Sequence, residues 1–256
     1  MVPCTFPPHG KISVAFLLVF LHNERGKSIK FIWRRPPVGN YENGIETRNK
    51  ILDACRDLFY QKGYEKTTFK DICAVAHINQ SSIHYHFKAK EAILKIIYEE
   101  TVEKNGREVE KYARKDTLPF AKFLFHTNLY LYKMLHDKSY LRLNLDASRI
   151  LDTAKFEEHI RSLATNFFGH DQKFVVLTED AFYTLMAVAG FDSSILLYLQ
   201  SHGDSCDFKT LSSHCAEMYR RIMNIGEEEF REASQQLEEI SACVDWEALD
   251  TSFLMD

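Results

Sequence analysis

The stretch of sequence that decides the fold is residues 47–94, TRNKILDACRDLFYQKGYEKTTFKDICAVAHINQSSIHYHFKAKEAIL. Apolar side chains recur from Ile51 to Phe59 at three- and four-residue spacing, as on one face of an amphipathic helix. Gly63 is placed to end that helix in a left-handed cap, and the Thr67-Thr68 pair is placed to cap the next helix. The stretch therefore predicts a series of short, well-delimited helices.

Two of these helices are short and are joined by a tight turn. The first is expected from Phe69 to Ala76 and the second from Gln80 to His86, with Asn79 as its N-cap. A longer helix follows from Lys90. This order is typical of a helix-turn-helix, in which the second short helix enters the major groove of DNA.

The second short helix has a polar outward face followed by basic Lys88 and Lys90. All side chains on that face can form hydrogen bonds and none is acidic: Asn79, Gln80, Ser81, Ser82, His84 and Tyr85. The alternative is a solvated polar surface without a ligand. A metal site at His84 and His86 is disfavoured, because residues two apart on a helix point to different faces.

The opening ILDACRDLFYQKGYEKTT and the close IHYHFKAKE resemble the DNA-binding domain of the tetracycline-repressor (TetR) family. The resemblance spans nearly fifty residues and about a fifth of the chain. It implies an all-α fold with an N-terminal three-helix helix-turn-helix domain and a larger C-terminal helical domain for ligand binding and dimerisation. It further implies a transcriptional regulator, by default a repressor, that is released from double-stranded operator DNA by a small-molecule effector.

The resemblance also assigns individual roles in DNA binding. Thr67 or Thr68, at the start of the second helix, would contact phosphate. The other phosphate contacts would come from Ser82, Tyr85 and Lys90. The side chains at or near base edges would be Asn79, Gln80, Ser81 and His84, of which Gln can pair bidentately with adenine.

One position departs from the family pattern. The family usually has glycine in the turn where this chain has His77. We expect a positive φ there, which histidine adopts at some cost.

Charge and cysteine content agree with a cytoplasmic regulator. Residues 116–256 have twelve basic against twenty-three acidic residues, whereas residues 45–115 have fourteen against eleven. A mildly basic front on an acidic body suits a nucleic-acid module joined to a body that does not touch DNA. The six cysteines form no CxxC pair, which favours a reducing compartment.

The first 44 residues allow three interpretations. Their apolar run ISVAFLLVFL is too short to span a bilayer, and a basic, Pro-containing stretch follows it. The segment is a translated upstream region from a mis-assigned start, or an arm packed on the body or along DNA, or a membrane-surface anchor.

The rest of the chain is expected to be helical. The domains are 45–92 for DNA binding, 93–240 for ligand binding and dimerisation, and 241–256 as an acidic tail that is either frayed or partner-binding. Helices are expected at 119–136, 139–150, 153–169, 173–200 and 207–239. A homodimer is expected through the helices near 179–200 and 207–237, the alternative being that both pack inside one chain.

Aromatic residues crowd positions 120–183, and most of them are expected in the core. The side chains that suit a lipophilic or aromatic effector are Phe123, His126, Tyr130, Tyr183 and Met186. His202 and Cys206 are four apart, but the intervening Gly203 and Asp204 favour a solvated loop over a metal site. We expect neither a metal nor a cofactor.

Two other classes of function are an enzyme and a membrane-associated protein. No GxSxG, HExxH, Walker or dinucleotide-binding motif occurs, so an enzyme is not expected. A membrane-associated interaction protein that uses the apolar N-terminus is the alternative from a different class. A ligand-independent regulator is the alternative within the same class.

Overall fold

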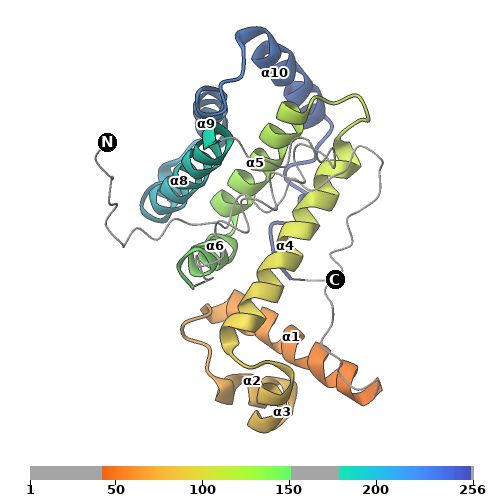
Figure 1. The fold of residues 1–256 in the computed structure, drawn as a ribbon. Helices are drawn as coiled ribbons and strands as arrows, with labels where there is room; N and C mark the ends of the chain where they lie inside the picture. Colours follow the sequence, from red (N-terminus) through yellow and green to blue (C-terminus); the bar gives the residue numbers. More distant parts are fainter. Residues whose placement is uncertain (1–41, 151–178, 255–256) are drawn as a thin grey trace, which may run out of the picture.

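The structure is a computed structural model that describes residues 42–150 and 179–254. In these two ranges every regular element is helical, which confirms the predicted all-α class (Figure 1). The elements are α1 (Glu42–Lys62), α2 (Phe69–Ala76), α3 (Gln80–His86), α4 (Lys90–Tyr112), α5 (Pro119–His136), α6 (Lys138–Ile150), α8 (Glu179–His202), the 3₁₀ turn η3 (Gly203–Ser205), α9 (Phe208–Ile222) and α10 (Glu227–Ala242). No described helix combines the length and the apolar character that a bilayer crossing requires.

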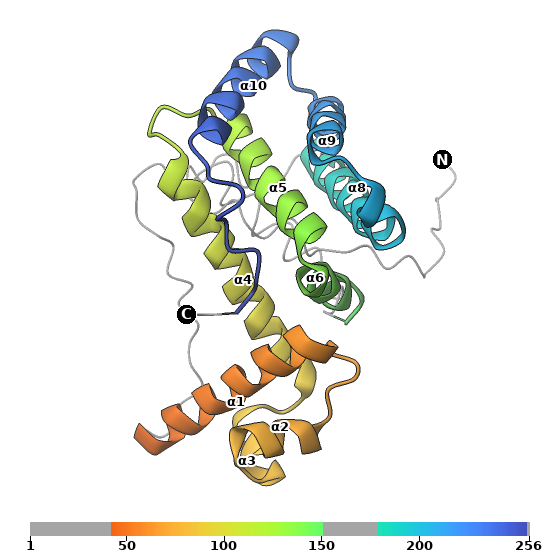
Figure 2. The same ribbon diagram turned by 180° about the vertical axis from the view of Figure 1, so that it is seen from behind.

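Helices α1, α2 and α3 form a small lobe at one end of the molecule (Figures 1 and 2). Its core is the apolar face predicted for α1, closed by one or two side chains from each following helix. The fully buried members are Ile51, Cys55, Ile72, Ile83, Ile93 and Leu94. A core of this kind fixes α3 against α1 because Ile83 is its anchor.

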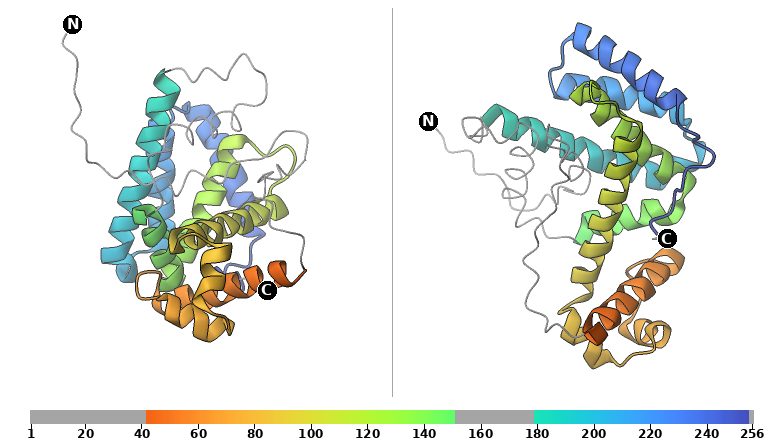
Figure 3. Two further views of the ribbon diagram at one scale, coloured as in Figure 1. Left: turned by 60° about the horizontal axis from the view of Figure 1, so that its bottom comes forward. Right: turned by 90° about the vertical axis from the view of Figure 1, so that its right-hand side faces the viewer.

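Helix α4 belongs to both parts of the molecule. Its first turns contribute Ile93 and Leu94 to the core of the lobe, whereas Tyr98 and Asn105 are buried further along. Figure 3 shows α4 running from the lobe into the rest of the chain. Helix α4 is therefore shared by the lobe and the body.

Helix α5 is the centre of the body. Pro119 occupies its first turn, where the missing N–H costs nothing. Residues 123–131 are all buried, because α4, α6, α9 and α10 pack around the helix. The predicted bounds of α5 are confirmed, and α6 begins one residue earlier than predicted. The helix expected at 153–169 lies outside the described residues.

The single helix expected at 207–239 is wrong, because the chain breaks it into α9 and α10. Asn224 adopts a left-handed φ of 53°, and the Ile225 N–H donates to the carbonyl of Arg220 at 2.9 Å. This is the geometry of a helix C-terminal cap, and Gly226 then starts α10. The predicted dimer range 207–237 therefore covers two helices.

The C-terminal residues 243–254, here called the strap, are packed and not frayed. They run from α10 back toward α1 (Figure 2). Phe253 is 1% exposed, and its ring meets the ring of Tyr60 in α1 edge-on at 5.3 Å. Lys104 in α4 pairs with Asp250 and donates to the carbonyl of Leu254. The strap thus contacts both the lobe and the body.

Candidate nucleic-acid interface

The start of α2 is fixed by a reciprocal cap. The Asp71 N–H donates to Thr68 Oγ1 at 3.2 Å, and the Asp71 carboxylate accepts from the Thr68 N–H at 2.8 Å. Lys62, at the end of α1, pairs with the same carboxylate at 2.7 Å. The hydrogen bonds from Lys62 and Thr68 hold the pKa of Asp71 well below its usual range. The two helix ends are therefore locked together.

The turn between α2 and α3 is strained at His77, as predicted. His77 has φ 52° and ψ 45°, in the left-handed region, and its N–H donates to the carbonyl of Cys73. The Ile78 N–H donates to the same carbonyl at 3.1 Å. A side chain in this conformation costs on the order of 1 kcal/mol relative to glycine.

The N-terminus of α3 is capped by Asn79, as predicted. Asn79 Oδ1 accepts from the backbone N–H of Ser82 at 2.9 Å. The hydroxyls of Ser81 and Ser82 donate to the same oxygen at 2.6 and 3.0 Å. These three side chains are thus engaged with one another, and their predicted contacts to bases and phosphate would compete with the cap.

The outward face of α3 is left to three exposed side chains, Gln80, His84 and Tyr85. Tyr85 is 76% exposed. Gln80 Nε2 lies 3.3 Å from His84 Nε2, so the amide donates to the ring. The His84 ring also packs against Phe69 of α2 at 5.1 Å, which limits its movement.

Two side chains predicted to bind phosphate have other roles in the structure. Thr67 is buried, and its hydroxyl donates to the carbonyl of Gly63 at 2.8 Å. Lys90 Nζ donates to the carbonyls of Tyr64 and Thr67, both at 2.7 Å, and lies 4.1 Å from the centroid of the Tyr64 ring. Burial lowers the pKa of Lys90. The loop between α1 and α2 thus lies on the first turn of α4 and engages both groups, and their contact with phosphate stays a prediction.

Lys88 is a further exposed cation near α3 that the residue-by-residue assignment leaves out. It is exposed in the turn between α3 and α4. Ala89, the N-cap of α4, offers no side-chain cap, so the first turn of α4 keeps N–H groups for an anion. The signal was available in the sequence, because Lys88 is the first basic residue after the polar face of α3.

The structure does not gather the five predicted effector residues. Phe123, His126 and Tyr130 are buried on α5, whereas Tyr183 on α8 is 62% exposed and Met186 is half-buried. The ring of His126 meets that of Tyr130 at 4.7 Å. The predicted effector set therefore includes both core and surface positions.

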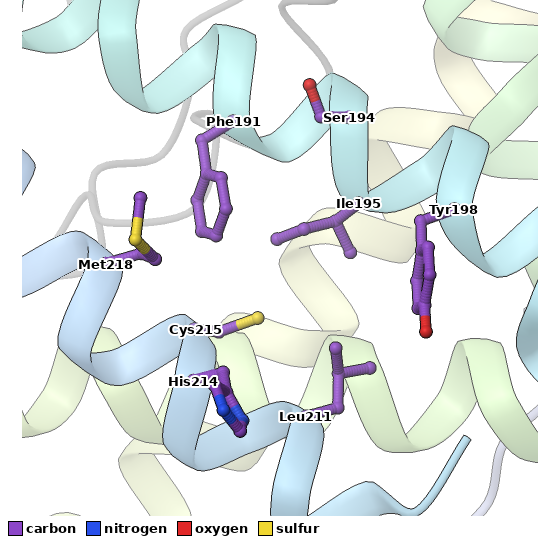
Figure 4. A pocket seen from close by; sticks show the side chains of 8 residues that line it. All are labelled: Phe191, Ser194, Ile195, Tyr198, Leu211, His214, Cys215 and Met218. Carbon is purple, nitrogen blue, oxygen red and sulfur yellow. The ribbon is translucent and has the colours of Figure 1, made fainter.

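An apolar groove of about 250 Å³ separates α8 from α9 on the surface (Figure 4). Its lining consists of Phe191, Ser194, Ile195, Tyr198, Leu211, His214, Cys215 and Met218. Tyr198 and Met218 are exposed although they are large and apolar. Both helices lie in the region where the sequence predicted a dimer.

Comparisons with known proteins agree with this geometry. Residues 51–97 match the family model "Bacterial regulatory proteins, tetR family". The chain is 42% identical over 55 residues to IcaR of Staphylococcus aureus strain Newman, a negative transcriptional regulator of a biofilm operon, covering 22% of this chain and 27% of that protein. It is 35% identical over 51 residues to the transcriptional regulator UidR of Escherichia coli K12, covering 20% and 26%.

The matched part spans about a quarter of the length of these curated relatives. Among solved structures, a gamma-butyrolactone receptor (ArpA-like protein) aligns with 79% of this chain and 99% of its own, at a TM-score of 0.43 and 17% identity. The matched residues 51–97 comprise most of α1, all of α2 and α3, and the start of α4. Residues 51–97 of the chain therefore carry a domain of the TetR family of bacterial regulatory proteins.

Proposed function

We propose that the chain is a sequence-specific DNA-binding repressor that acts in the cytoplasm as a homodimer and has no catalytic activity. The observation that carries the proposal is the outward face of α3. Gln80, His84 and Tyr85 are exposed and non-acidic on a helix that buried Ile83 and the Asn79 cap hold in place. Such a helix is suited to the major groove, where Gln can pair with the edge of adenine.

Phosphate contacts on either side of α3 would set the register on DNA. Thr68 is exposed at the start of α2, and Lys88 is exposed before α4. Tyr85 is exposed on α3, and it lies between Thr68 and Lys88 in the sequence. Thr67 and Lys90 would act indirectly, because their contacts hold the loop and α4 that position these groups.

The groove between α8 and α9 would receive the same face of a second copy. Tyr198 and Met218 are exposed apolar side chains on its edges, and a two-fold contact pairs one patch with itself. Such a dimer would place two α3 helices in successive major grooves, roughly 34–36 Å apart. Met218→Glu tests the interface by sedimentation: a monomer supports it, and an unchanged dimer contradicts it.

Release by an effector would act through α4. Ile93 is buried in the lobe and Asn105 in the body, so these two residues would transmit a tilt of the helix. A small molecule in the body would release DNA only if it binds the tilted state more tightly than the DNA-bound state.

The test of DNA binding is selection from a random duplex pool with the full chain, followed by titration of the selected duplex at two salt concentrations. Wild type should bind the selected duplex in a salt-dependent manner. Gln80→Ala should weaken that binding by about 1–3 kcal/mol and leave nonspecific binding nearly unchanged.

Gln235→Ala, on an exposed face of α10, is the matched control and should bind like wild type. The absence of salt-sensitive binding to any duplex would contradict the proposed function.

A further inference from the structure

Gln80 and His84 form a hydrogen-bonded pair on the outward face of α3. They are four residues apart, so their side chains lie on the same side of the helix, and both are exposed. Gln80 Nε2 lies 3.3 Å from His84 Nε2. An amide nitrogen can only donate, so the imidazole Nε2 accepts and the proton of the neutral ring is on Nδ1. The contact therefore sets both the direction of the hydrogen bond and the tautomer of His84.

The imidazole of His84 is held by Phe69 of α2. The two ring centroids are 5.1 Å apart, and the ring planes are tilted by 53°. Phe69 is the first residue of α2 and packs against the hydrophobic core. Because Phe69 belongs to another helix, the acceptor that Gln80 meets is fixed by the packing of α2 against α3.

The other polar side chains at the start of α3 are engaged in its cap. The hydroxyls of Ser81 and Ser82 donate to Asn79 Oδ1. Gln80 is the first residue of α3, and its amide is directed to His84 instead. Of these four N-terminal side chains, Gln80 is the one that can pair with a base while the cap stays intact.

The hydrogen bond to His84 determines which groups Gln80 presents to a base. An amide has one oxygen and two N–H groups. When one N–H is donated to His84, the oxygen and the second N–H remain, and this pair matches N6 and N7 of adenine. If the amide were turned over, its oxygen would face the lone pair of His84 Nε2, and two acceptors repel each other. The turned amide would present only N–H groups, which suit the acceptors N7 and O6 of guanine.

We propose that His84 is a positioning residue that holds Gln80 in the orientation that pairs with adenine and disfavours guanine. The inference rests on the proposed function, because it concerns the base that α3 contacts. The sequence places both side chains at or near base edges, and the structure joins them into one unit. His84 then acts on specificity through Gln80.

The test on DNA uses the full chain and the selected duplex. Selection with wild type and with Gln80→Ala identifies the position at which the base preference depends on Gln80, and adenine is expected there. The ratio of the affinities for duplexes with A·T and with G·C at this position is then measured. His84→Phe keeps a ring against Phe69 and removes the acceptor. It should lower this ratio about 2- to 10-fold, the effect of one hydrogen bond.

Three further variants separate positioning from other roles. His84→Glu supplies an acceptor, so it should keep the adenine preference although its negative charge weakens binding to DNA overall. Added to Gln80→Ala, His84→Phe should leave the ratio unaltered, because His84 acts through Gln80. His136→Phe is the matched control, at an exposed histidine that ends α5 and stacks on Tyr132, and it should keep the wild-type ratio.

The pair can also be tested in the protein without DNA. Nitrogen-15 NMR spectra recorded at alkaline pH should show the neutral ring of His84 protonated at Nδ1. Gln80→Ala should shift the ring toward the tautomer protonated at Nε2, because Nε2 no longer accepts a hydrogen bond from the amide.

Four results would overturn the inference: a base other than adenine at the position that depends on Gln80, an unchanged ratio in His84→Phe, an equal loss when His84→Phe is added to Gln80→Ala, or a wild-type His84 protonated at Nε2. Each of them is compatible with specific binding of the selected duplex, so the proposed function stands. The absence of salt-sensitive binding to any duplex rejects the proposed function and the pairing with adenine together.

Discussion

The lobe and the body differ in the hydrogen-bond partners of their polar side chains. In the lobe, Thr67 and Lys90 donate to backbone carbonyls of the loop between α1 and α2, so their hydrogen bonds stay within the lobe. In the body, the side chains of Lys133 and Asp192 are buried and form hydrogen bonds with the neutral side chains of Asn105 and Tyr219. The polar side chains of the lobe thus brace its backbone, whereas the body has charged side chains in its interior.

A substitution in the strap is expected to have the largest effect on stability, because the strap contacts both the lobe and the body. Phe253→Ala should destabilise the chain by about 3–5 kcal/mol, because a buried aromatic side chain is lost against α1. Since the strap contacts both parts, urea unfolding followed by circular dichroism should show a separate, earlier transition of the lobe. Glu247→Ala, exposed in the same segment, is the control and should unfold like wild type. One transition at an unchanged midpoint would show that the strap does not join the two parts.

Lys133 tests the cost of a buried charge in the body. It is 1% exposed, and burial lowers its pKa to about 8 from 10.5. The unfolded chain therefore binds more protons than the folded chain between pH 8 and 10.5, and stability rises with pH across that window. Below pH 8 the charged amine is buried at full cost.

Lys133→Met should consequently raise the free energy of unfolding at pH 7 by about 1–2 kcal/mol, less than the full cost because Asn105 loses a donor. It should also flatten the rise in stability between pH 7.5 and 9.5, as measured by urea denaturation. Lys122→Met, a less buried lysine on the same helix, should keep that rise. If Lys133→Met is less stable than wild type, the hydrogen bond to Asn105 stabilises the fold by more than the burial of the charged amine costs.

The sequence predicted those features that local rules determine. Gly63, His77 and Asn79 have the expected cap and turn geometries, because each depends only on residues within one turn. The end of α9 at Asn224 also depends on nearby residues, but it was not predicted because the helical spacing of apolar residues continues on both sides of it. Helix α5 was located within its observed bounds because its proline and its apolar run are unambiguous.

Features that depend on distant contacts could not be predicted. Lys90 lies against a loop more than twenty residues earlier, so its role in bracing was not visible in the motif. Asp192 meets Tyr219 across 27 positions, and the strap returns to α1 across most of the chain. Which polar groups become buried together is a property of packing and not of spacing.

Lys88, just before α4, and Lys90, its first residue, are expected to have different and smaller effects on DNA binding and stability. Lys88→Ala should weaken binding of the selected duplex and reduce the slope of log K against log salt by about 0.9, because one phosphate contact is lost. Lys90→Met should leave that slope unchanged and lower the melting temperature, because its amine braces the loop. If the slopes of both variants fall equally, Lys90 also contacts the phosphate, as the sequence predicts.

The smallest expected effect is at His77, where the rigid lobe carries strain. Its imidazole is exposed, so its replacement loses few contacts, and the left-handed backbone is the main cost. His77→Gly should raise the free energy of unfolding by about 0.5–1 kcal/mol, the relief of strain offset in part by the greater freedom of glycine in the unfolded chain. His77→Ala keeps the strain and should be no more stable than wild type. If Ala stabilises the chain as much as Gly, the side chain and not the backbone is the source of the cost. DNA affinity should stay equal in all three proteins, since the hydrogen bond from this residue to Cys73 belongs to the backbone.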